Sequence, residues 1–143
     1  MNKSRWFLAH SKKDEDEDID RWCAQLASHM TDDVWQAEVV AGRDDYKSRA
    51  AALGGWAAWC RDVAVGKSYT GGHLFHGIIV PVDSTQESLS VGKATAQLLE
   101  WFLDAKKHVF AWCPESESFK SITGLAAKES DDWTSWVTLT VAE

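Results

Sequence analysis

Proline, cysteine and long apolar runs are all scarce in this chain of 143 residues. It has only two prolines, and 45% of its residues are hydrophobic against 26% charged, which is typical of a compact fold and excludes a disordered or collagen-like chain. No apolar run approaches the roughly 20 residues that cross a bilayer, and no signal-peptide core follows the N-terminus. We therefore expect a cytoplasmic protein with no membrane contact, folded as one domain over residues 1–143.

The few cysteines and histidines exclude two kinds of framework. Cys23, Cys60 and Cys113 are odd in number and far apart, so the sequence predicts neither a disulfide scaffold nor a zinc site. The five histidines have no spacing that would gather three metal ligands on one face. We therefore expect no bound metal and no other cofactor.

Basic residues are outnumbered by acidic ones. The formal net charge is −7, and residues 14–20 alone carry six carboxylates and no base. Because binding to a phosphate backbone is driven by clustered Lys and Arg, we expect no general binding of nucleic acid. The acidic run precedes and opens a predicted helix, where carboxylates interact favourably with the positive end of the helix dipole.

Apolar periodicity predicts strands that alternate with helices. Helical spacing links Ile19, Trp22 and Leu26, whereas residues 74–80 are apolar almost without interruption, as a buried strand requires. Strands are expected at 5–9, 34–40, 74–80 and 107–112. Helices are expected at 19–30, at 46–63 with a break at Gly54-Gly55, and at 91–105. In the tail we expect strands at 119–125 and 137–141 and a short helix capped by Asp131-Asp132.

This alternation argues for an open parallel sheet, since each parallel pair needs a crossover connection. We expect an α/β fold, a three-layer sandwich whose mostly parallel central sheet has the flavodoxin-like order 2-1-3-4-5. In such sheets ligands bind beyond the carboxyl ends of the strands, where the strand order reverses. The site should therefore lie among the loops 10–16, 42–46 and 83–92.

Polar side chains in these loops are the predicted site residues. Asp14, Asp44 and Asp83 are placed to act as a general base or to stabilise an oxocarbenium-like sugar. The helix start at residues 90–93, Ser-Val-Gly-Lys, offers free backbone N–H groups beside a cation, which suits a phosphate or carboxylate. The expected ligand-binding residues of the loops are His10, Ser11, Arg43, Ser84, Ser90, Gly92, Lys93 and Thr95.

Nine tryptophans are a high count for this length. Most lie in apolar stripes, where they fill the core. Trp56, beside the predicted helix break, and Trp112, at the end of the fourth predicted strand, are also positioned to stack on a nucleobase. We therefore add both to the expected ligand-binding residues.

Two groups of segments resemble known families. Phe7-Leu8-Ala9-His10-Ser11, followed by Asp14, resembles the strand-and-loop opening of Toll/interleukin-1 receptor (TIR) domains. Residues 78–83, 92–95 and 107–110 are similar in layout to nucleoside 2-deoxyribosyltransferases. Both families have flavodoxin-like sheets and handle N-glycosidic bonds of nucleosides or NAD, so the resemblance implies a nucleoside- or nucleotide-handling domain. The chain also resembles small uncharacterised phage-encoded proteins.

One position departs from the transferase pattern. The resemblance places the catalytic glutamate four residues after Gly92, where this chain has Ala96. The nearest carboxylate, Glu100, lies about 12 Å from Gly92 along a helix. It remains a candidate nucleophile or base, although its polar stripe is also that of a solvated helix face.

Three functions stay open on this evidence. The chain could cleave or transfer at an N-glycosidic bond, it could capture a nucleoside or nucleotide without reaction, or it could be a TIR-like protein-interaction module. The expected partner is a small-molecule nucleoside or nucleotide, and a homodimer is a further expectation.

Overall fold

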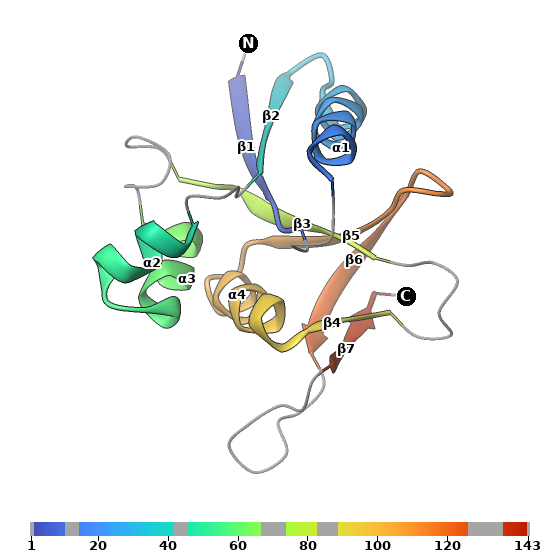
Figure 1. The fold of residues 1–143 in the computed structure, drawn as a ribbon. Helices are drawn as coiled ribbons and strands as arrows, with labels where there is room; N and C mark the ends of the chain where they lie inside the picture. Colours follow the sequence, from blue (N-terminus) through green and yellow to red (C-terminus); the bar gives the residue numbers. More distant parts are fainter. Residues whose placement is uncertain are drawn as a thin grey trace.

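The computed structural model describes residues 2–10, 15–41, 46–66, 74–82, 89–125 and 136–142. Within these ranges the chain forms one sheet with helices packed on it (Figure 1), and no helix is long and apolar enough to cross a membrane. The strands are β1 (Asn2–Leu8), β2 (Trp35–Ala41), β3 (Gly77–Pro81), β4 (Ser90–Gly92), β5 (His108–Cys113), β6 (Ser118–Leu125) and β7 (Trp136–Val141). The helices are α1 (Asp16–Met30), α2 (Tyr46–Leu53), α3 (Trp56–Val65) and α4 (Lys93–Asp104).

The parallel half of the sheet consists of β2, β1, β3 and β5. β1 pairs in parallel with β2 and β3, and β3 pairs in parallel with β5. Ile78, Ile79 and Val80 of β3 are all buried, as expected of a central parallel strand covered on both faces. The expected α/β class is confirmed at this level.

The other half of the sheet contradicts the expected topology. The full order is β2-β1-β3-β5-β6-β7-β4, and β6, β7 and β4 each pair antiparallel with their neighbour. The sheet is therefore mixed rather than mostly parallel, and the flavodoxin-like order 2-1-3-4-5 is wrong. The turn of residues 114–117 between β5 and β6 is the reason, because a connection this short returns the chain antiparallel and leaves no room for a crossover helix.

Helices cover both faces of the sheet, and each face has its own core. On one face α1 packs through Trp22 and Leu26. On the other face α3 and α4 pack through residues that include Val63 and Phe102, both fully buried. Side chains of one strand alternate between the two cores because successive residues point to opposite faces.

The break between α2 and α3 falls at the predicted glycines. Gly54 and Gly55 have φ of +106° and +134°, a conformation that glycine adopts without a steric penalty. The prediction of a break at this point is confirmed. The predicted helix cap at Asp131-Asp132 lies outside the described residues.

Candidate functional site

The three loops expected to form the site are described only in part. Eight of the fourteen predicted site residues fall in the described ranges, and the rest do not. Ser11, Asp14, Arg43, Asp44, Asp83 and Ser84 lie outside the described residues, and His10, Trp56, Ser90, Gly92, Lys93, Thr95, Glu100 and Trp112 lie within them.

His10 lies at the point where the strand order reverses. It follows the end of β1, which sits between β2 and β3. The backbone N–H of the preceding residue, Ala9, donates to the carbonyl of Ile79 at 2.9 Å, so the ends of β1 and β3 are held together. His10 is half-buried there.

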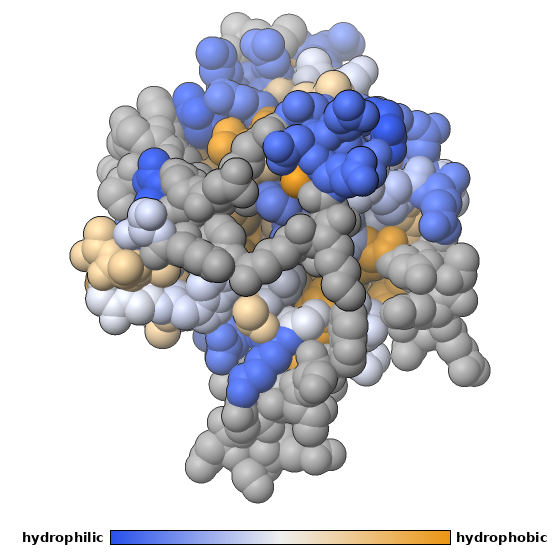
Figure 2. Space-filling view, in the orientation of Figure 1, coloured by the Kyte–Doolittle hydropathy of each residue, from blue (hydrophilic) through white to orange (hydrophobic). Residues whose placement is uncertain are grey.

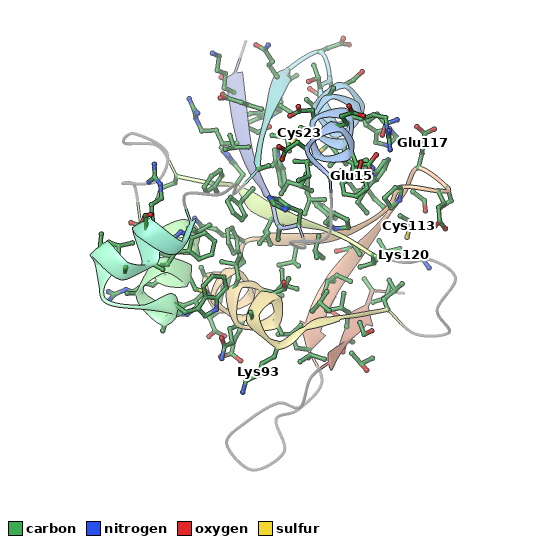
Figure 3. All side chains as sticks on the ribbon, viewed as in Figure 1. Glu15, Cys23, Lys93, Cys113, Glu117 and Lys120 are labelled. Atoms are coloured by element: carbon green, nitrogen blue, oxygen red, sulfur yellow. The ribbon has the colours of Figure 1, made fainter. Side chains whose placement is uncertain are left out.

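The β4–α4 junction lies in a different part of the sheet. Ser90 and Gly92 belong to β4, an edge strand that is four positions away from β3 in the strand order. Lys93 and Thr95 open α4, and Figure 3 shows Lys93 extending outward from the start of that helix. Glu100 follows two turns later on the same helix. In the strand order, Ser90 and Gly92 are therefore five positions from β1, the strand that His10 follows.

Trp56 and Trp112 have different surroundings. Trp56 stacks on Trp59 with ring centroids 4.8 Å apart, in the core under α3 and α4. Trp112 is only 1% exposed and belongs to the core under α1. No single ligand can contact both rings, because the sheet lies between them.

A groove of about 620 Å³ opens between α1 and the β5–β6 turn, and we call it the α1 groove. It brings together one stripe of α1 with the end of β5 and the turn that follows. Figure 3 shows Glu117 on this turn beside α1. The groove is lined by Ala24, Gln25, Ser28, His29, Trp112, Ser116 and Glu117.

A hydrogen bond spans the groove between residues 92 positions apart. The amide Nε2 of Gln25 donates to Oε1 of Glu117 at 3.2 Å. Glu117 has a φ of +49°, which is uncommon for a residue other than glycine. Beside it, the hydroxyls of Ser116 and Ser118 lie 2.7 Å apart. The turn thus presents a carboxylate and hydroxyls next to an amide of α1.

Two ring-bearing residues, Trp112 and His29, line the α1 groove, and the ring of Phe119 contacts both of them. The ring centroid of Phe119 lies 4.9 Å from that of Trp112 and 5.1 Å from that of His29. The indole Nε1 of Trp112 is buried and has no hydrogen-bond partner among the described residues. A buried donor left unpaired costs about 1–3 kcal/mol.

The electrostatics of the α1 groove disfavour anions. No lysine or arginine is among its lining residues, whereas Glu117 is. The first turn of α1 is acidic at Asp16, Glu17 and Asp18, and hydrophilic residues gather over this helix in Figure 2. Within the described ranges no group of three histidines, cysteines or carboxylates is arranged to hold a metal ion.

Ala96, the position of the glutamate in the transferase pattern, is a core position. It is 0% exposed and packs in the cluster under α3 and α4. A carboxylate at this point would be buried without a partner, at a large cost in free energy. Ala96 therefore has a packing role in the core and is not at the position of a catalytic side chain.

Sequence reasoning found Trp112 and missed the rest of the α1 groove. Gln25, Ser28 and His29 share one helical stripe, to which the sequence analysis assigned no role. Residues 115–118, Glu-Ser-Glu-Ser, form a polar turn between two strand-like segments, which is a hairpin signal. Reading that hairpin would have placed Ser116 and Glu117 at the end of β5.

Comparison with protein-family models, with curated proteins and with solved structures finds no match. The function is therefore argued from the chemistry of the site.

Proposed function

We propose that this protein is a nucleoside-binding domain that holds its ligand in the α1 groove, where the absence of a lining lysine or arginine favours an uncharged nucleoside over a nucleotide. The observation that carries the proposal is the lining of the groove, which sets the rings of Trp112 and His29 beside amide, hydroxyl and carboxylate groups of Gln25, Ser28, Ser116 and Glu117. An aromatic wall with a few convergent polar side chains is the usual composition of a small-molecule site.

The size and chemistry of the groove suit such a ligand. Its volume of about 620 Å³ is within the range of about 300–1,000 Å³ common for ligand pockets. Amide, hydroxyl and carboxylate groups from Gln25, Ser28 and Glu117 match the donors and acceptors of a base and a sugar. Trp112 and His29 supply the rings beside which a flat base can lie.

Binding without reaction is favoured over glycosidic catalysis by Ala96, which is buried in the core where the transferase pattern has its glutamate. Transfer or hydrolysis at an N-glycosidic bond is the alternative. It would depend on Asp14, Asp44 or Asp83, the loop carboxylates that the sequence predicts for that chemistry.

The test is to incubate the purified protein with nucleosides, nucleotides and NAD, and to quantify retained ligand and released base by mass spectrometry. We expect intact nucleoside to be retained, and the anionic nucleotides and NAD to be retained less. Ala24→Trp places an indole in the groove and should abolish retention, whereas Ala57→Trp, at an exposed position of α3 on the other side of the sheet, should not. Released base would establish the enzymatic alternative, and the absence of both signals would refute the proposal.

A TIR-like protein-interaction module is the second candidate. Val34, Trp35 and Leu74 are 56%, 41% and 43% exposed at the starts of β2 and β3, and the Trp35 ring contacts His76 at 5.9 Å. Exposed apolar patches of this kind mark interaction surfaces. A second copy of the chain in a homodimer is the partner to test first, by sedimentation velocity. Trp35→Ser should then shift the protein to monomer.

A further inference from the structure

We infer that Gln25 and Glu117 recognise a pair of neighbouring hydroxyls, so that the α1 groove binds a ribose-bearing ligand more tightly than its 2′-deoxy counterpart. The inference rests on the proposed function and names the substrate class of that site. Its basis is the 3.2 Å hydrogen bond between Gln25 Nε2 and Glu117 Oε1 at the groove.

The carboxylate has capacity for more than this one bond. Two carboxylate oxygens together offer about four lone-pair sites, and Gln25 occupies one of them. Glu117 is exposed, so a ligand can reach the others. Two hydroxyls on adjacent carbons can each donate to one oxygen of a carboxylate, and a carboxylate accepting from the 2′-hydroxyl is a recurrent means of ribose recognition.

The amide of Gln25 completes the pair of contacts. A hydroxyl both donates and accepts, so a ribose hydroxyl that donates to Glu117 can also accept from the Gln25 amide. Gln25 and Glu117 then stay next to each other, and the ligand hydroxyl forms one hydrogen bond to each of them. A 2′-deoxy sugar has no oxygen at this point and would leave part of the hydrogen-bonding capacity unused.

The positions of Trp112 and Glu117 orient the ligand. Of these two lining residues, Trp112 lies on β5, whereas Glu117 lies on the turn. A nucleoside therefore directs its base toward the strands and its sugar toward the turn. The lack of a lysine or arginine in the groove lining is consistent with recognition of a sugar by uncharged and anionic groups.

The test is isothermal titration calorimetry with four matched pairs: adenosine, guanosine, cytidine and uridine, each against its 2′-deoxy form. We expect at least one pair to bind, with the ribonucleoside tighter by on the order of tenfold or more, the effect of one hydrogen bond to a charged acceptor. In Glu117→Gln the ratio should fall toward one, because the ribonucleoside loses two hydroxyl contacts with the carboxylate, whereas the deoxynucleoside loses only that of its 3′-hydroxyl. Gln25→Met should reduce the ratio as well.

Glu17→Gln is the matched control, because it removes the same charge from an exposed position in the first turn of α1. It should keep the parent ratio. Equal affinity for the two members of each binding pair, or an unchanged ratio in Glu117→Gln, overturns the inference and leaves the proposed function standing. If no nucleoside of any pair binds, the proposed function fails and the inference fails with it.

Discussion

Trp56 and Trp112 lie on opposite faces of the sheet, one in the core under α3 and α4 and the other in the core under α1. Only Trp112 lines the α1 groove. The sequence predicts that both rings stack on a nucleobase, but in the fold only the Trp112 ring is placed at the groove.

Matched substitutions of the two rings should therefore differ in effect. Trp112→Phe shrinks a ring that lines the groove, and we expect it to weaken nucleoside binding roughly threefold to tenfold, a loss comparable to that of one neutral hydrogen bond. Trp56→Phe should leave the affinity unchanged, since that ring packs on Trp59. Calorimetric titration of both variants measures the difference, and equal losses would show that the rings act through stability.

Ala96 is the position where the structure opposes the transferase resemblance most directly. We expect Ala96→Glu to lower the free energy of unfolding by about 3 kcal/mol or more, because it buries a carboxylate in an apolar core. Ala94→Glu, at an exposed position of the same helix, is the control and should cost far less. Urea unfolding measures both. A stable Ala96→Glu protein that releases base from a nucleoside would contradict our interpretation.

The three cysteines should differ in reactivity. Burial raises the pKa of the Cys60 thiol to about 12, so at pH 8 it is almost entirely protonated, and the thiolate is the reactive form. Cys113 is buried, whereas Cys23 is half-buried on α1. We expect iodoacetamide to modify Cys23 first, and Cys60 only after unfolding. Peptide mapping by mass spectrometry after timed labelling measures the order, which early modification of Cys60 would contradict.

Asp32 should make stability depend on acidic pH. Its carboxylate accepts hydrogen bonds from the backbone N–H of Trp35 at 2.6 Å and of Val34 at 2.8 Å, and these bonds lower its pKa below the ordinary value of 3.8. The stabilisation is complete above the pKa of the unfolded chain and is lost as the pH falls through the lower pKa of the folded protein.

Asp32→Ala should therefore be less stable than the parent at neutral pH, and the difference should shrink as the pH falls from about 5 to about 2. Thermal unfolding across this range measures the effect. A difference that stays constant with pH would show that the carboxylate charge is not involved.

The sequence was sufficient for the parallel half of the fold. The apolar stretch that became β3 and the 3–4 spacing of Ile19, Trp22 and Leu26 on α1 are local patterns, and residues 78–80 and these three helix residues are buried as expected. The expected strand start at Leu74 is wrong, because β3 begins at Gly77 and Leu74 is exposed. Gly54 and Gly55 mark a helix break by their backbone freedom alone. Local chemistry determines such elements, so periodicity was enough to find them.

The other half depends on pairings that periodicity does not report. Ser90–Gly92 was expected to be a loop and a helix start, yet it forms β4 because it pairs with β7, with Val91 opposite Val137. β6 runs antiparallel to β5 because the turn of residues 114–117 between them is too short for a crossover connection. Likewise, Gln25 and Glu117 are 92 residues apart, so only the folded chain shows that they share a groove.

The most direct test of the central claim is to map the backbone amide chemical shifts of the labelled protein while a nucleoside is added. We expect saturable shifts at Gln25, Ser28, Ser116 and Glu117 on both sides of the α1 groove. Shifts confined to the β4–α4 junction at Gly92 and Lys93, or no shifts with any nucleoside, would contradict the assignment of this groove as the ligand site.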